Sequence, residues 1–147
     1  MFSTIVVGTD GSETAAEAVR QAVELASTVG GRLEIVSAYE PVPGSRLRNE
    51  AQHVPPDVQW TINPREDVDA TLADAAAVAE AAGVPAAVHA RQGDPADAIL
   101  RVAGEMNADL IVVGNKGMRG ASRILGSIPN HIAHKAPCSV LIVNTTE

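Results

Sequence analysis

Hydrophobic and polar positions along the chain follow two periods, one typical of buried strands and one typical of helices. Five short runs are apolar and rich in β-branched residues on both faces, as in strands inside a parallel sheet. Between them, apolar residues recur at spacings of three and four, which predicts helices packed against a core. The expected strands are residues 4–8, 33–38, 86–90, 110–113 and 139–143, and the expected helices are residues 15–29, 68–82, 95–106 and 127–135.

The alternation of strands and helices predicts an α/β fold. Strand–helix–strand units in series give an open five-stranded parallel sheet with helices on both faces. A chain of 147 residues has the length of one compact domain. We therefore expect a single domain over residues 1–147, with a long proline-rich loop at about residues 40–64. Asp10 or Ser12 could cap the first helix.

Composition excludes several classes of protein. Eleven Lys and Arg residues against 18 Asp and Glu give a net charge of −7, which argues against a general nucleic-acid binder. The single cysteine, Cys138, cannot form an intrachain disulfide. No apolar run approaches the length of a membrane span, and no secretory signal is evident. We expect a soluble protein of the cytoplasm that binds neither nucleic acid nor membrane.

Two segments follow strands at positions where ligands bind in open parallel sheets. The first is residues 8–12, and the second is the glycine-rich segment 114–120 that leads towards Ser127. Glycines allow close approach to backbone N–H groups, and a helix start attracts anions. These features suit a phosphate, although the same glycines could simply form a tight connection. Asp10 could likewise be a ribose or Mg²⁺ ligand, or only a structural residue of the turn.

Other phosphate and metal motifs fit poorly. The second segment is neither a P-loop nor Gly-x-Gly-x-x-Gly. The acidic pair of a phosphorylated receiver domain is absent after the first strand. His131 and His134 lie one helical turn apart without further ligands at suitable spacing, and nothing in the sequence surrounds His53 or His89 with partners.

Three motifs, in order, give the chain a strong resemblance to the universal stress protein family of the ATP-binding type. The opening run from Ile5 to Ser12 resembles the first strand of that family and its Asp. Asp109 to Gly114, followed by Gly117 and Gly126-Ser127, resembles the nucleotide motif Gly-x₂-Gly-x₉-Gly-Ser/Thr, with eight residues here in place of nine. The ending Ala136 to Val143 resembles the final strand. The resemblance covers essentially the whole chain.

The resemblance implies a Rossmann-like sheet with strand order 3-2-1-4-5, an adenine-nucleotide site and a homodimer. Thr9 and Asp10 would line the nucleoside, and main-chain groups around Ser37 and Ala38 would meet the adenine. Mg²⁺ would be held by the nucleotide phosphates and not by a dedicated metal site. The full set of expected nucleotide-binding residues is Gly8, Thr9, Asp10, Ser37, Ala38, Gly114, Asn115, Lys116, Gly117, Arg119, Gly126, Ser127, Ile128 and Pro129.

The last strand is apolar and would lie at a sheet edge, where natural proteins cover or pair the exposed backbone. In the family it resembles, this strand pairs with its twin, so the interface would comprise Val140, Leu141, Ile142, Val143 and Asn144. The leading hypothesis is a dimeric stress-response or regulatory protein that binds ATP with Mg²⁺. The alternatives are a cyclic AMP-binding member of the family, a dimeric scaffold without nucleotide, or a slow ATPase. No catalytic residue is expected, because no water-activating base accompanies a transition-state cation.

Overall fold

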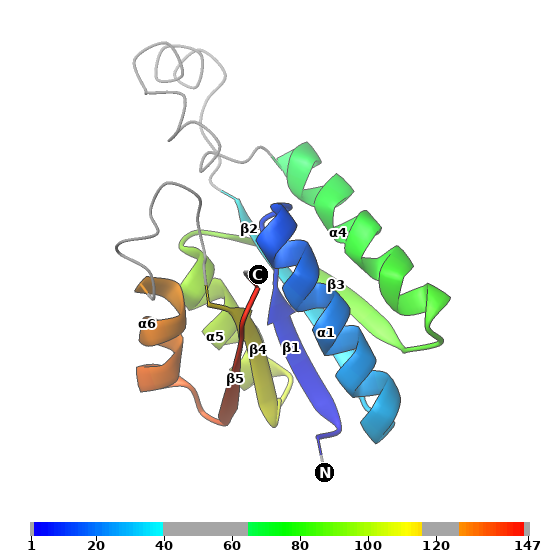
Figure 1. Cartoon of the computed structure of the whole chain (residues 1–147). Coiled ribbons are helices and arrows are strands. Elements are labelled where there is room, and N and C mark those ends of the chain that lie inside the picture. The colour runs from blue at the N-terminus through cyan, green and yellow to red at the C-terminus, as the bar shows by residue number, and fades with distance from the viewer. Residues whose placement is uncertain (1, 40–64, 116–126, 146–147) are drawn as a thin grey trace.

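A computed structural model of the chain describes residues 2–39, 65–115 and 127–145 (Figure 1). Strands and helices alternate through these ranges, as the sequence predicts. In chain order they are β1 (Thr4–Gly8), α1 (Glu13–Val29), β2 (Arg32–Tyr39), α4 (Arg65–Ala81), β3 (Ala86–Gln92), α5 (Pro95–Glu105), β4 (Leu110–Gly114), α6 (Ser127–Lys135) and β5 (Ser139–Val143).

The strands form one parallel sheet in the order β3-β2-β1-β4-β5. This confirms the predicted open sheet and its strand order. Gly8 at the end of β1 is level with Val36 of β2, and Val7 is level with Val112 of β4. The carboxyl ends of the three central strands therefore meet at one edge of the sheet. β3 and β5 are the two edge strands.

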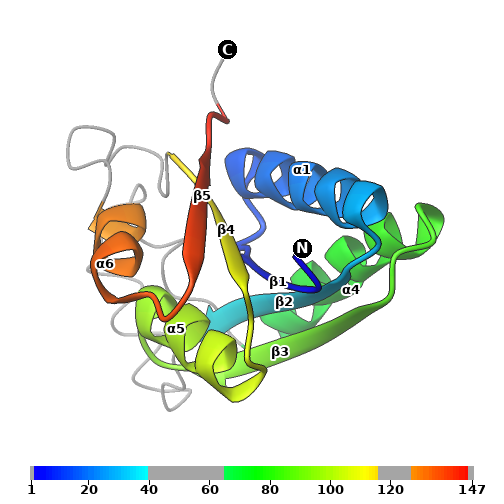
Figure 2. The ribbon, with the colours of Figure 1, turned by 90° about the horizontal axis from the view of Figure 1, so that it is seen from below.

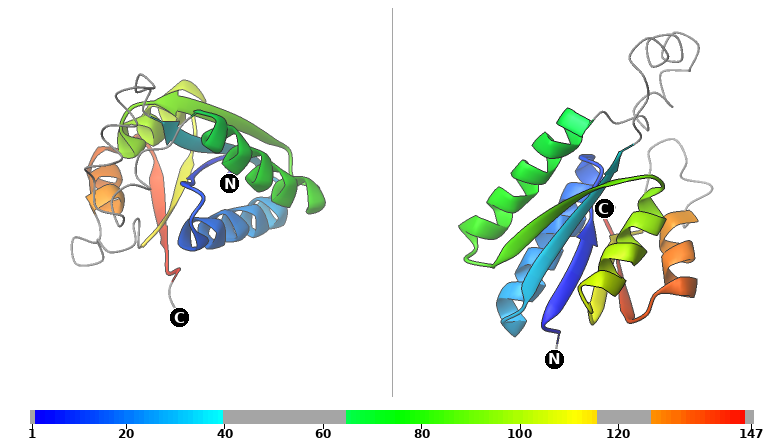
Figure 3. Two further views of the ribbon diagram at one scale, coloured as in Figure 1. Left: turned by 90° about the horizontal axis from the view of Figure 1, so that it is seen from above. Right: turned by 180° about the vertical axis from the view of Figure 1, so that it is seen from behind.

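Helices cover both faces of this sheet, as Figures 2 and 3 show. α1 and α4 pack on one face around a core that includes Ile5, Ile35 and Leu72. α5 and α6 pack on the other face, around a second core that includes Val6 and Ile111. Burial on both faces explains why β1 and β4 are almost continuously apolar.

Local signals position the helix starts. The hydroxyl of Ser12 accepts a hydrogen bond from the Ala15 N–H (3.2 Å), so Ser12, and not Asp10, is the N-cap of α1. Gly30 ends the same helix in the left-handed conformation, with φ of 73°. Asp94 caps α5, and Pro95 occupies its first turn, where the missing N–H costs nothing.

Most element boundaries lie within three residues of those expected from the periodicity. The predicted loop at 40–64 lies outside the described residues. Across the described ranges, none of the helices has both the length and the apolar character needed to cross a bilayer.

Candidate functional site

The chain reverses its winding direction between β1 and β4. The helix that follows β1, α1, lies on one face of the sheet, whereas the connection that leaves β4 leads to α6 on the other face. The left view of Figure 3 looks down on the carboxyl ends where these connections begin. Open α/β sheets bind ligands at such a switch point, because the two connections separate there.

The turn from β1 into α1 is organised by its own side chains. Thr9 N–H continues the ladder by donating to the Val36 carbonyl (2.9 Å). Asp10 Oδ1 accepts from the Ser12 N–H (2.9 Å), and Thr9 Oγ1 accepts from the Gly11 N–H (3.2 Å). Asp10 thus shapes the turn, and its half-buried carboxylate lies at the switch point.

Two glycines in this turn are needed for different reasons. A Cβ at Gly8 would collide with Cδ1 of Ile99 from α5 and lie 3.1 Å from its Cγ1. Gly11 has a φ of +85°, which side-chain-bearing residues rarely adopt, and a Cβ there would lie 2.9 Å from Thr71 Oγ1. The turn between β1 and α1 therefore has no room for side chains at these two positions.

The carboxyl end of β2 lies beside the turn that follows β1. Ser37 is buried, and Ala38 is half-buried against the core on the α5 face. Tyr39, the last residue of β2, contacts Arg65 at the start of α4: the guanidinium lies 5.2 Å from the ring centroid and donates to the phenol oxygen (3.3 Å). This contact ties β2 to α4 beside the expected adenine-binding residues.

At the end of β4, Asn115 holds the chain that follows β5. Its N–H donates to the Val143 carbonyl (2.8 Å), and its Nδ2 donates to Asn144 Oδ1 (3.3 Å). Its Oδ1 accepts from both the N–H (2.9 Å) and the hydroxyl (3.0 Å) of Thr145. The sequence indicates Asn115 as a nucleotide contact but does not indicate these partners, which lie 28 to 30 residues away.

The remaining expected contacts are divided between two groups. Lys116, Gly117, Arg119 and Gly126 lie outside the described residues. Ser127 begins α6, Ile128 is half-buried against the α5-face core, and Pro129 is buried in the first turn of the helix. The structure therefore brings together the expected residues of β1, β2 and β4.

A buried charged group lies on the α5 face, away from these strand ends. Glu34 of β2 is 0% exposed, and its Oε1 lies 2.7 Å from His89 Nε2 of β3. Its Oε2 lies 2.8 Å from Arg32 Nε. The expectation that His89 has no partner around it is therefore wrong. A glutamate between two apolar residues of a predicted strand, Leu33 and Ile35, was the signal that could have revealed the pair.

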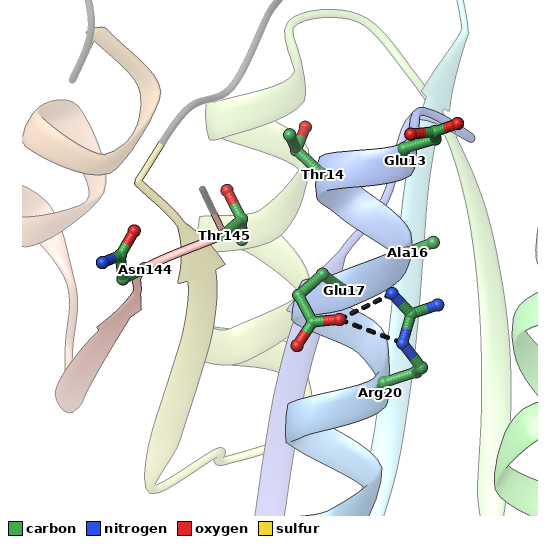
Figure 4. Close-up of a pocket in the computed structure, with 7 residues that line it drawn as sticks. All are labelled: Glu13, Thr14, Ala16, Glu17, Arg20, Asn144 and Thr145. Carbon is green, nitrogen blue, oxygen red and sulfur yellow. Dashed lines mark hydrogen bonds and ion pairs between the residues drawn. The ribbon is translucent and has the colours of Figure 1, made fainter. Parts of the chain in front are cut away.

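A surface hollow of about 540 Å³ lies between the start of α1 and the chain after β5 (Figure 4). Glu17 pairs with Arg20 on its helical wall (2.6 Å). Hydrogen bonds from Gln21 and Arg20 lower the pKa of the Glu17 carboxyl. Among the residues that the structure describes, the hollow is lined by Glu13, Thr14, Ala16, Glu17, Arg20, Asn144 and Thr145, and none of these belongs to the expected nucleotide-binding set.

Metal ligands do not gather anywhere in ranges 2–39, 65–115 and 127–145: no three His, Cys, Asp or Glu side chains there could share an ion. His131 of α6 instead lies 3.3 Å from the Asp97 carboxylate at the start of α5. A Mg²⁺ that accompanies a nucleotide would need phosphate oxygens as ligands.

Comparisons with known proteins extend over the whole fold. The profile of the Universal stress protein family matches residues 1–144. A universal stress protein of Mycobacterium tuberculosis is 37% identical over 148 residues, covering 99% of this chain and 98% of the relative. One from Thermus aquaticus is 38% identical, covering 97% and 99%. A crystal structure of a universal stress protein in complex with cAMP is similar at a TM-score of 0.74, with 34% identity over 99% of this chain and 98% of that one.

Proposed function

Because this chain belongs to the universal stress protein family, we propose that it binds an adenine nucleotide where β1, β2 and β4 end. The observation that carries the proposal is the switch point between β1 and β4. There a carboxylate, Asp10, and two strand-end glycines, Gly8 and Gly114, meet at one sheet edge. Half-buried backbone without side chains and a single acidic group suit a ribose and its phosphates.

The residues divide into three roles in this proposal. Thr9 and Asp10 contact the ribose, and main-chain groups of Ser37 and Ala38 meet the adenine. Glycine backbone and helix N–H groups hold the phosphates, and the nucleotide phosphates hold Mg²⁺. The residues assigned to the phosphate side are Gly114, Lys116, Gly117, Arg119, Gly126 and Ser127, with Ile128 and Pro129 beside them.

ATP with Mg²⁺ and cyclic AMP are the two ligands to compare. The glycine-rich motif after β4 and its two cationic side chains, Lys116 and Arg119, favour a polyphosphate. The relative that is 34% identical to this chain was crystallised with cAMP, which favours the cyclic nucleotide. We place ATP first because a triphosphate would use both cationic side chains.

The proposed protein is a cytoplasmic stress-response or regulatory homodimer that pairs through the outer edge of β5. Leu141 is 43% exposed and Ile142 is 47% exposed, and they point to opposite faces of the sheet. A second copy pairing with this edge would cover apolar side chains on both faces. The proposed interface is Val140, Leu141, Ile142, Val143 and Asn144.

The test of nucleotide binding is isothermal titration of nucleotide-free protein with Mg²⁺–ATP and, separately, with cAMP. We expect wild-type protein to bind at least one of them and Asp10→Asn to weaken it by about tenfold or more. Asparagine keeps an oxygen that can accept from the Ser12 N–H, so the turn is preserved while the charge is removed.

Asp74→Asn is the matched control, since Asp74 is exposed on α4 and the same charge is lost there. This variant should bind as wild type does. If wild-type protein binds neither nucleotide, the proposed function is wrong. Equal weakening by both variants would show an effect of net charge and not of a site at β1.

A further inference from the structure

Asn115 connects the end of β4, which belongs to the proposed nucleotide site, with the end of β5, which belongs to the proposed dimer interface. It directly follows Gly114, the last residue of β4. Through four hydrogen bonds it also holds three consecutive residues at the end of the chain: Val143, Asn144 and Thr145. Val143 ends β5, so Asn115 continues the β4–β5 pairing beyond the last regular residue pair.

Gly114 is shaped to accept this contact. A Cβ at Gly114 would lie only 3.0 Å from Thr145 Cγ2 and 3.9 Å from the Ala18 Cβ of α1. Because glycine has no side chain, Thr145 lies directly over the end of β4, with its hydroxyl and N–H both directed at Asn115 Oδ1. Asn144 and Thr145 then form the wall of the hollow that faces α1 (Figure 4).

The bonds of Asn115 leave it little capacity for a ligand. Its N–H is used by Val143, and its Oδ1 already accepts two hydrogen bonds. An amide oxygen has two lone pairs, so this acceptor is saturated. The N–H and the Oδ1 of Asn115 are therefore committed to the protein's own chain.

We propose that Asn115 is a positioning residue that couples nucleotide binding at the end of β4 to dimerisation at β5. The inference rests on the proposed function, since it takes the ligand site and the dimer edge from there. A ligand that meets Gly114 restrains the backbone next to Asn115. Asn115 transmits that restraint to Asn144, which belongs to the proposed interface. Coupling between sites is reciprocal, so dimerisation should tighten nucleotide binding by the same factor.

The first experiment needs no ligand. Amide hydrogen exchange of Thr145 should be protected in the wild-type protein and about tenfold faster in Asn115→Ala. Asn115→Asp keeps an oxygen acceptor for the Thr145 N–H and should restore the protection. A wild-type Thr145 amide that exchanges freely, or one unchanged in Asn115→Ala, would overturn the positioning role.

Thr145→Val provides a second, milder variant in case Asn115→Ala fails to fold. Valine keeps the shape of the side chain over Gly114 but removes the hydroxyl that donates to Asn115 Oδ1. Thr28→Val is its control, because the Thr28 hydroxyl donates only within α1, to the Glu24 carbonyl at an exposed site. Thr145→Val should weaken the dimer severalfold, and Thr28→Val should leave its dissociation constant unchanged.

The second experiment measures the dimer dissociation constant by sedimentation, with and without saturating Mg²⁺–ATP or cAMP. In the wild-type protein the nucleotide should tighten the dimer by about fivefold or more, and in Asn115→Ala this factor should fall towards one. The coupling would be overturned if nucleotide tightened the dimer equally in both proteins, or if it did not tighten the wild-type dimer. Titration of the same samples with nucleotide distinguishes a lack of coupling from a failure of the proposed function, in which no nucleotide binds at all. If no nucleotide binds, the hydrogen exchange of the Thr145 amide still tests whether Asn115 positions the end of the chain.

Discussion

The carboxylate of Glu34 is fully buried between β2 and β3, where charge is costly unless it is paired. His89 Nε2 at 2.7 Å is the hydrogen-bond partner of Oε1, and Arg32 Nε at 2.8 Å is the ion-pair partner of Oε2. Both partners retain some contact with water, since their side chains are 15% and 52% exposed. The cluster therefore depends on Glu34 more than on either partner.

Replacing this residue should destabilise the fold. We expect Glu34→Ala to lower the free energy of unfolding by about 3 kcal/mol, because it removes buried side-chain volume and leaves His89 without its partner. Urea unfolding of the wild-type and variant proteins measures the difference. Glu80→Ala, which removes an exposed carboxylate from α4, should change it by less than about 0.5 kcal/mol. A similar decrease in the free energy of unfolding in both variants would contradict a special role for the buried pair of Glu34 and His89.

Backbone conformation at Gly11 supports a second prediction for a single residue. Gly11→Ala should destabilise by about 1–2 kcal/mol, because alanine is strained at a φ of +85° and its Cβ would approach Thr71 Oγ1. Gly104→Ala is the matched control: Gly104 is in α5 and has open space around the Cβ position. Alanine there should be neutral or stabilise by about 0.5 kcal/mol. In thermal unfolding, Gly11→Ala should have a lower midpoint temperature than wild type, and Gly104→Ala should have one that is equal or higher.

Pairs of strands are held at their ends by side chains from the connections. At the amino ends of β1 and β4, Asp109 accepts hydrogen bonds from the Ser3 N–H (2.9 Å), the Ser3 hydroxyl (3.1 Å) and the Thr4 N–H (3.1 Å). At the carboxyl ends of β4 and β5, Asn115 has the corresponding role. Both residues bind the backbone just outside the regular ladder, where strands would otherwise fray.

Asp109 makes the pairing of β1 with β4 sensitive to acid. The Ser3 N–H, the largest cause, and the Thr4 N–H hold the pKa of the Asp109 carboxyl below its ordinary value of 3.8. A lowered folded-state pKa means that the contribution to stability is complete above about pH 3.8 and is lost as pH falls through the lower folded value. Asp109→Asn should therefore be less stable than wild type at neutral pH, by about 1.5 kcal/mol.

The difference between Asp109→Asn and wild type should shrink as the pH falls below 3.8 and through the lower folded-state pKa of Asp109, where the carboxyl of the folded wild-type protein becomes protonated as well. Urea unfolding at neutral and at acid pH measures both differences. Asp74→Asn is a suitable control, as it removes the same charge at an exposed position. A constant difference between Asp109→Asn and wild type across this pH range would contradict the assignment.

Local sequence predicted the elements well because each depends on neighbouring residues. Apolar runs such as Leu110 to Val113 and caps such as Ser12 are complete within a few positions. The contacts of Glu34 with His89 and of Asn115 with Thr145 join residues 55 and 30 positions apart. They depend on which strands lie side by side and in which register, which no local pattern contains. The sequence thus indicates Asn115 as a nucleotide contact, which stays a prediction, and it does not indicate the partners that Asn115 has within the chain.

The whole molecule presents two sheet edges of different character. On β3, Arg91 brings charge to the edge and donates to both oxygens of Glu105 (3.1 and 2.7 Å) from α5. Charged side chains of this kind discourage the addition of another strand. On β5, the four residues from Val140 to Val143 are all apolar. The asymmetry favours β5 as the edge that pairs with a second copy.

This asymmetry makes the proposed dimer testable with two matched substitutions. Ile142 on β5 is 47% exposed and Val88 on β3 is 46% exposed, so a glutamate at either site changes a similar surface on opposite edges. Ile142→Glu should raise the dimer dissociation constant by at least about tenfold, because each copy would bring a charge into the apolar strand edge that the dimer covers. Sedimentation at micromolar concentrations should then show monomer for Ile142→Glu and dimer for wild type and Val88→Glu.

A wild-type protein that stays monomeric, or a dimer that is disrupted only by Val88→Glu, would contradict an interface at β5. The coupling through Asn115 would then lose its target, whereas the nucleotide site at β1 and β4 would stand on its own titration.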